Sequence, residues 1–135
     1  MSADSARTGI LRESAWPLND SEVSDWTDKY FRRTKEVVER FGDARVTYAV
    51  FMRRPVISAP RLTIEWLQAV ALERNTSFNI DLRYEEGRWV GAGEPIMYVG
   101  GSLKNLVDLE TLLLQKLGPP CVAAYNAYTM CADLP

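Results

Sequence analysis

Two consecutive arginines, Arg53 and Arg54, are the residues whose type and position best suit a binding site. They close a run rich in β-branched and aromatic residues, so they stand where a strand meets a loop. The planar guanidinium group of arginine donates two parallel hydrogen bonds to a phosphate or carboxylate group. The pair therefore fits a phosphate clamp, while a solvated strand end is the more common setting for such a pair.

A second candidate segment is Thr27-Asp28-Lys29-Tyr30, which lies inside a predicted helix. Asp28 and Arg32 are four residues apart, so an ion pair on a solvated helix face accounts for their charges. Tyr30 would then belong to the core or its boundary. The residues alone favour this structural interpretation over a binding role.

Glu110 lies among leucines on another predicted helix. A carboxylate in such a setting needs a partner or faces a groove. Carboxylates in this setting more often form structural hydrogen bonds than take part in catalysis. No acid–base pair can be placed from the sequence, so we assign no catalytic residue.

The chain contains no histidine. Its absence excludes histidine general bases, serine–histidine and cysteine–histidine nucleophiles, and histidine-ligated metals. The two cysteines, Cys121 and Cys131, cannot complete a four-ligand zinc site alone, and we interpret them as small buried thiols on a helix. We therefore expect no metal site in this chain. The spacing of the glycines matches neither common nucleotide-binding loop, so we read them as hairpin and hinge residues.

Length and composition describe one ordinary globular domain. The chain has 135 residues, of which 47% are hydrophobic and 25% charged, and its net charge is −2. This balance predicts no broad surface for nucleic acid or membrane. No apolar run is long enough to cross a bilayer, and the first residues lack a secretory pattern, so we expect a cytoplasmic protein.

The pattern of apolar residues predicts an α+β fold with a mainly antiparallel sheet. We expect a flexible arm over residues 1–14 and one domain over 15–135. The expected elements are a helix over 21–41, a strand over 45–54, a helix from Pro60 to 75, a strand over 77–84, strands over 88–91 and 95–99, and helices over 103–117 and 121–133.

Three details of this pattern are specific enough to be tested. The strand over 45–54 is apolar on both faces, which indicates a central strand covered on each side. The turn over 91–94 joins the two short strands as a hairpin, and 100–102 form a hinge before the next helix. Gly118-Pro119-Pro120 then separates the last two helices.

Four segments together resemble nicotinate phosphoribosyltransferases. They are Thr27 to Tyr30, the strand from Val46 to Arg54 that ends at Pro55, Gly93-Glu94-Pro95-Ile96, and Leu109 to Leu114. The resemblance spans about residues 20–135, and residues 56–85 match in pattern only. It identifies the chain with the N-terminal domain of this family, without the family's barrel.

The resemblance implies a function for the complete enzyme. Family members join nicotinate to phosphoribosyl pyrophosphate to form nicotinate mononucleotide in NAD biosynthesis, with ATP and Mg²⁺. They are dimers in which the N-terminal domain of one subunit closes the barrel site of the other. By this resemblance Tyr30 stacks on the pyridine ring, Asp28 shapes the pocket, and Arg53, with Arg54 next, contacts phosphate.

The absent barrel limits this expectation. With it go the phosphate-binding loops and a histidine that family members phosphorylate, so we expect no activity and no bound cofactor from this chain alone. The partner would be a barrel domain or subunit, in a homo- or hetero-oligomer. The alternatives are a non-catalytic binding or regulatory module that docks on a partner protein, and a degenerate paralogue.

Overall fold

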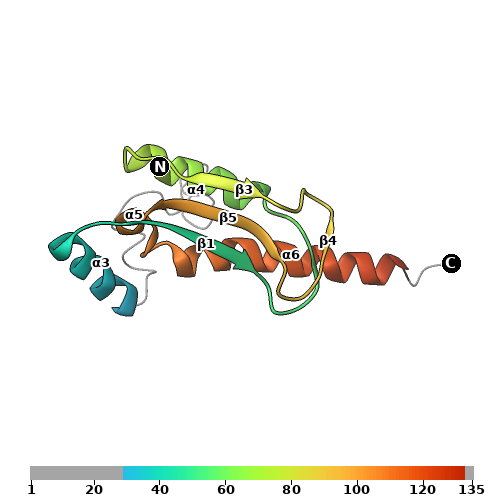
Figure 1. Cartoon of the computed structure of the whole chain (residues 1–135). Helices are drawn as coiled ribbons and strands as arrows, with labels where there is room; N and C mark the ends of the chain where they lie inside the picture. Colours follow the sequence, from blue (N-terminus) through green and yellow to red (C-terminus); the bar gives the residue numbers. More distant parts are fainter. Residues whose placement is uncertain (1–28, 133–135) are drawn as a thin grey trace, which may run out of the picture.

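A three-stranded antiparallel sheet backed by helices forms the centre of the molecule (Figure 1). The computed structural model describes residues 29–132. In spatial order the sheet consists of β1 (Arg45–Phe51), β5 (Pro95–Ser102) and β3 (Asn79–Leu82). Helices α4 (Arg61–Glu73) and α6 (Glu110–Ala132) pack on one face of it. The predicted α+β class with an antiparallel sheet is confirmed.

The first described helix, α3 (Lys29–Phe41), ends where the sequence predicts. Gly42 follows it with a φ of +118°, a conformation that favours glycine, and its N–H donates to the carbonyl of Val38 at 2.9 Å. The predicted start of this helix at residue 21 and the arm over 1–14 lie outside the described residues.

Strand β1 is an edge strand and not the central strand that its composition suggested. Its side chains alternate: Val46, Tyr48 and Val50 face the helices, while Thr47 and Ala49 are exposed on the open face. The central strand is β5, which pairs with β1 on one side and with β3 on the other. The prediction failed because small residues such as Ala49 occupy an uncovered face as readily as a covered one.

The two short strands after residue 87 do not form the expected hairpin. β4 (Trp89–Val90) pairs with β2 (Val56–Ile57), a strand that the sequence did not reveal, and β5 enters the larger sheet. The turn at 91–94 therefore carries the chain from one sheet to the other. The Glu94 carboxylate accepts hydrogen bonds from the N–H of Gly91 and the hydroxyl of Tyr84, which fixes this turn.

Residues 100–102 are the last part of β5 and not a separate hinge. A Cβ added to Gly101 would lie 2.9 Å from the ring of Phe78, so this position requires glycine for close packing. Ser102 occupies the N-cap position of α5 (Leu103–Leu106), but its side-chain oxygen accepts no hydrogen bond from the helix. Its hydroxyl donates to the carboxylate of Asp43. A turn then separates α5 from α6, so the expected helix over 103–117 is two helices.

Helix α6 continues through Gly118-Pro119-Pro120, which corrects the predicted break. A proline inside a helix costs about 3 kcal/mol, because it removes a hydrogen bond and crowds the preceding turn. Leu117 and Cys121 are fully buried on either side of these residues. We attribute the continuity of the helix to this packing, which outweighs local propensity.

The core lies between the sheet and helices α4, α5 and α6. Its largest fully buried side chains include Trp66, Leu67, Ile96, Met97 and Leu117. Cys121 belongs to this core, but Cys131 is exposed, so only one of the two expected buried thiols is buried. No helix within residues 29–132 has both the length and the apolar character needed to cross a membrane.

Candidate functional site

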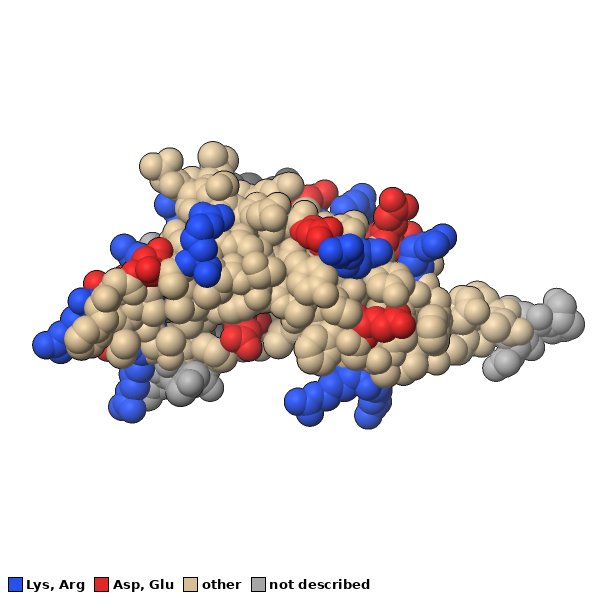
Figure 2. All heavy atoms as spheres, in the orientation of Figure 1, with Lys and Arg blue, Asp and Glu red and all other residues tan. Residues whose placement is uncertain are grey.

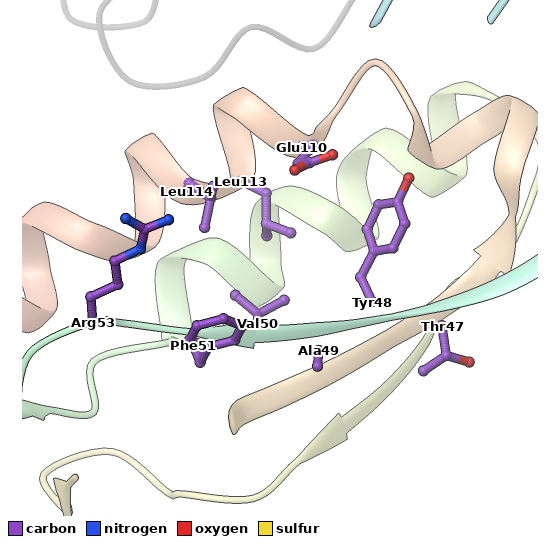
Figure 3. A pocket seen from close by; sticks show the side chains of 9 residues that line it. All are labelled: Thr47, Tyr48, Ala49, Val50, Phe51, Arg53, Glu110, Leu113 and Leu114. Carbon is purple, nitrogen blue, oxygen red and sulfur yellow. The ribbon is translucent and has the colours of Figure 1, made fainter. Parts of the chain in front are cut away.

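A groove of about 450 Å³ lies between strand β1 and the first turns of α6 (Figure 3). Its wall on the strand side consists of Thr47, Tyr48, Ala49, Val50, Phe51 and Arg53, and its wall on the helix side consists of Glu110, Leu113 and Leu114. Because β1 is an edge strand, the groove is open along one side. The site is therefore a slot beside a sheet edge and not an enclosed cavity.

Strand and helix periodicities explain which side chains line the groove. Alternation along β1 turns Tyr48 and Val50 toward α6. Glu110, Leu113 and Leu114 stand three and four residues apart, so they share one face of α6. Figure 3 shows these side chains converging on the same space.

The two ends of the groove carry opposite charges. Figure 3 shows the Glu110 carboxylate above the Tyr48 ring, and the Arg53 side chain reaching from the end of β1 toward Leu114. Within the described part of the chain, neither Glu110 nor Arg53 is engaged in a hydrogen bond or an ion pair. Both charges are available to a ligand or a partner.

Tyr48 connects the acidic end of the groove to the core. Burial raises the pKa of its phenol, and the negative charges of Glu110 and Asp108 raise this pKa further. Tyr48 therefore stays protonated well into the alkaline range and can donate a hydrogen bond. Arg53 at one end, Tyr48 and Glu110 at the other, and leucines between them can bind a molecule that has an anionic group and a flat or apolar part.

A buried ion-pair network holds the start of α6 in place. The Arg74 guanidinium donates to both carboxylate oxygens of Asp108, at 2.8 and 3.0 Å, and also to the carbonyl of Asn105 at 2.9 Å. Lys35 on α3 donates to Asp108 at 3.1 Å. The network ties α3, α4 and the turn before α6 together. It therefore positions Glu110, which follows Asp108 by two residues.

Burial and charge act in opposite directions on Asp108. Burial alone would raise its pKa, but the hydrogen bonds and positive charges of Arg74 and Lys35 outweigh burial and lower the pKa below its usual value. Asp108 is thus ionised and fully engaged in the fold.

The predicted binding residues have different outcomes. Arg53 lies in the groove, and Arg54 is exposed beside it and does not line it. Tyr30 lies on α3, but its side chain is outside the described part of the structure, as is all of Asp28. Whether Tyr30 and Asp28 converge on the groove stays a prediction.

The sequence did not single out Tyr48 or the groove itself. Tyr48 stands in a strand whose sequence is apolar on both faces. Only the pairing of β1 with a single neighbour reveals that a groove runs beside this strand. Glu110 was expected to have a partner or to face a groove, and it lines the groove.

A second depression lies on the open face of the sheet, near the Pro95 end of β5. It is wide and shallow and is lined by Arg83, Tyr84, Glu94, Pro95 and Tyr98. Its acid, Glu94, is already bound by Tyr84 and Gly91, and the hydrogen bond to Glu94 raises the pKa of Tyr84. Since its polar groups hold the turn in place, this depression is the weaker candidate.

The described residues offer no metal site: within 29–132, no group of three acidic or cysteine side chains could hold an ion. They therefore do not fit the Mg²⁺ that the family resemblance implies for the complete enzyme, and we derive no step through it.

Solved structures share this fold. A nicotinate-nucleotide pyrophosphorylase from Pyrococcus furiosus superimposes with a TM-score of 0.58 over 76% of this chain, at 22% sequence identity. A protein described by the same name, from Francisella tularensis, gives a TM-score of 0.50 over 69% of the chain, at 15% identity. The matched parts make up 27% and 35% of those proteins, so this chain corresponds to about a third of their length or less.

Sequence comparison identifies the family. No curated protein matches the chain significantly. The sequence model "Quinolinate phosphoribosyl transferase, N-terminal domain" matches residues 28–121, which include β1, Arg53 and the helical wall of the groove. The chain therefore belongs to the family of quinolinate phosphoribosyl transferase N-terminal domains.

Proposed function

We propose that this chain is the N-terminal domain or subunit of a nicotinate phosphoribosyltransferase. In that role it helps a barrel, carried on the same longer chain or on a separate polypeptide, to form nicotinate mononucleotide from nicotinate and phosphoribosyl pyrophosphate. The observation that carries the proposal is the overlap of the family match at 28–121 with both walls of the groove.

The chemistry of the reaction suits the groups in the groove. The pyridine nitrogen forms a bond to the ribose carbon while the bond from that carbon to pyrophosphate breaks. Positive charge develops on the ribose, and pyrophosphate leaves as an anion. Such a reaction depends on positioning and electrostatics more than on a protein nucleophile. We assign Arg53 to phosphate contact and keep Tyr30, Asp28 and Arg54 as further substrate-binding candidates.

The second half of α6 is the surface we assign to barrel docking. From Cys121 to Ala132 the helix has no charged residue, and Val122, Tyr128 and Met130 are exposed there. Figure 1 shows this half extending beyond the sheet, and Figure 2 shows no charged side chain on its visible face. An uncharged helix face of this kind is typical of a protein–protein contact.

The test is an activity assay on the native assembly. The untagged chain is isolated from its source with any polypeptide that accompanies it, and the mixture is assayed for nicotinate mononucleotide. We expect Arg53→Ala to lower kcat/KM about 10- to 100-fold, since a hydrogen bond to a charged group contributes about 1.5–3 kcal/mol. Arg54→Ala is the matched control, and we expect a smaller loss.

One result would contradict the proposed function, and a second would contradict only the role of Arg53. The first is a chain that forms no product even when a barrel from a nicotinate phosphoribosyltransferase is supplied. The second is an active assembly in which Arg53→Ala and Arg54→Ala are equally harmless. The first result favours the non-catalytic binding or regulatory module, and the second removes Arg53 from the site.

A further inference from the structure

The outer edge of β1 carries unused backbone hydrogen-bonding groups. The N–H of Leu103 donates to the carbonyl of Ala44 at 2.8 Å, which makes this pair a hydrogen-bonded one in the β1–β5 ladder. Such pairs alternate along antiparallel strands, so Val46, Tyr48 and Val50 bond to β5. The backbone groups of Arg45, Thr47, Ala49 and Phe51 must therefore point to the free edge.

This edge lacks the features that usually protect a free strand. β1 is seven residues long and contains neither proline nor lysine, and its one bulge lies at the end, between Val50 and Phe51. Within residues 29–132 no strand pairs with its outer side. A long, regular and largely uncharged edge readily accepts another strand.

We propose that this edge is an interaction surface on which a second copy of the chain pairs through its own β1. The two strands would run antiparallel about a two-fold axis at Tyr48. This register overlaps the whole of β1, because Arg45 then faces Phe51 of the second copy and Thr47 faces Ala49. All four of these residues present their backbone groups to the edge, so the donors and acceptors of the two β1 strands face each other.

The side chains are complementary in this register. On the helix side Val46 lies opposite Val50, and Val46 of the second copy enters the apolar middle of the groove beside Leu113 and Leu114. Beyond the strand ends, Arg53 lies opposite Asp43 of the second copy. The Asp43 carboxylate accepts hydrogen bonds from Ala44, Ser102 and Lys104 of its own chain but is exposed, so opposite charges approach twice across the axis. The matched strands, the valine contacts and the two Arg53–Asp43 pairs together select a second copy as the occupant, although the two Glu110 carboxylates lie on either side of the axis.

Self-pairing has a consequence for the groove. It would fill the open side and direct Arg53 to a carboxylate, so a chain paired in this way could not also offer Arg53 to a phosphate. The inference rests on the edge geometry and does not depend on the proposed enzyme activity. If both hold, phosphate binding by Arg53 must compete with self-pairing through β1.

The first experiment measures oligomeric state and edge protection together. Sedimentation velocity over a concentration series of the full chain should show a monomer–dimer equilibrium. Hydrogen exchange followed by NMR should show the amides of Thr47 and Ala49 becoming protected as the dimer forms. The amide of Tyr48, which bonds to β5, should be protected at every concentration.

Variants then test the register. Ala49→Pro removes an edge N–H on each strand, and proline is tolerated where the N–H faces outward, so we expect loss of the dimer. Ala49→Ser keeps the N–H and should dimerise like the wild type. Arg53→Glu places like charges together twice and should raise the dimer Kd about tenfold, while Arg54→Glu should leave it unchanged.

Three outcomes would overturn the proposal. They are a chain that stays monomeric with freely exchanging edge amides, a monomer whose edge amides are protected, and a dimer that persists in Ala49→Pro. The second outcome would mean that residues 1–28 or another segment of the same chain cover the edge. Circular dichroism of Ala49→Pro checks whether this variant is folded. Arg53→Glu provides a second test that leaves the backbone intact.

Discussion

Asp108 and Glu110 are two residues apart at the start of α6, and their surroundings are opposite. The Asp108 side chain is only 8% exposed and has two cationic partners, Arg74 and Lys35. Glu110 is half-buried at the end of the groove and, among residues 29–132, forms neither a hydrogen bond nor an ion pair. The same type of group thus serves the fold in one case and stays available in the other.

The difference shows how the fold supports the candidate groove at this place. A buried carboxylate without partners would be too costly, so Asp108 is held by a bidentate arginine. That contact fixes the turn before α6. Glu110, whose charge faces the groove, needs no partner because solvent reaches it. The structural role therefore falls to Asp108, and Glu110, in the same turn, stays available to a ligand.

The largest effect should come from removing Arg74. Arg74→Met leaves Asp108 buried with Lys35 alone, and we expect the free energy of unfolding to fall by about 3–5 kcal/mol. Urea denaturation with a constant m-value measures this loss. Lys35→Met is the control, because the Lys35 side chain is 27% exposed and its removal should cost about 1 kcal/mol or less. Equal losses in the two variants would show that Arg74 is not the main partner.

A smaller effect is expected in acid. The folded state lowers the pKa of Asp108 below its usual 3.8. The stability that this shift contributes is present above the unfolded-state value and is lost as the pH falls through the folded-state value. Asp108→Asn should lower stability at neutral pH by about 1–3 kcal/mol and should weaken the decline in stability as the pH falls from about 5 to below the folded-state pKa. An unchanged decline would assign acid sensitivity to other carboxylates.

Much of the fold could be predicted from local patterns. Helix α3 ends and helix α4 begins near the predicted residues because Gly42 and Pro60 give strong local signals. Strand pairing could not be predicted so well. The order β1-β5-β3 and the separate pair β2-β4 depend on contacts between distant residues, and the local turn at 91–94 looks the same in a hairpin and in a crossing between sheets.

The failure at Gly118-Pro119-Pro120 has a similar cause. Local propensity predicts a break, but Leu117 and Cys121 bury the same helix face on both sides of it. The groove was predictable only in part. The sequence indicated that Arg53 could contact phosphate and that Glu110 needs a partner or faces a groove. The groove between them exists because β1 is an edge strand, and no residue of β1 reveals this.

The smallest effect on stability should come from Glu110→Gln, which tests whether Glu110 is free of a structural role. We expect the free energy of unfolding to change by less than about 0.5 kcal/mol, because no partner is lost. The pKa of Tyr48 should fall, since the negative charge of Glu110 adds to the effect of burial, and it should stay above its usual value because burial remains.

Tyrosine side-chain NMR through an alkaline titration measures this change, and Tyr84 is the internal control, because its pKa is raised by Glu94 and should not move. A Tyr48 pKa that does not fall would mean that the Glu110 charge is directed away from the phenol. A stability loss above about 1 kcal/mol would mean that Glu110, like Asp108, helps to hold the fold together. The groove would then have one free charge, Arg53, and would favour a purely anionic ligand.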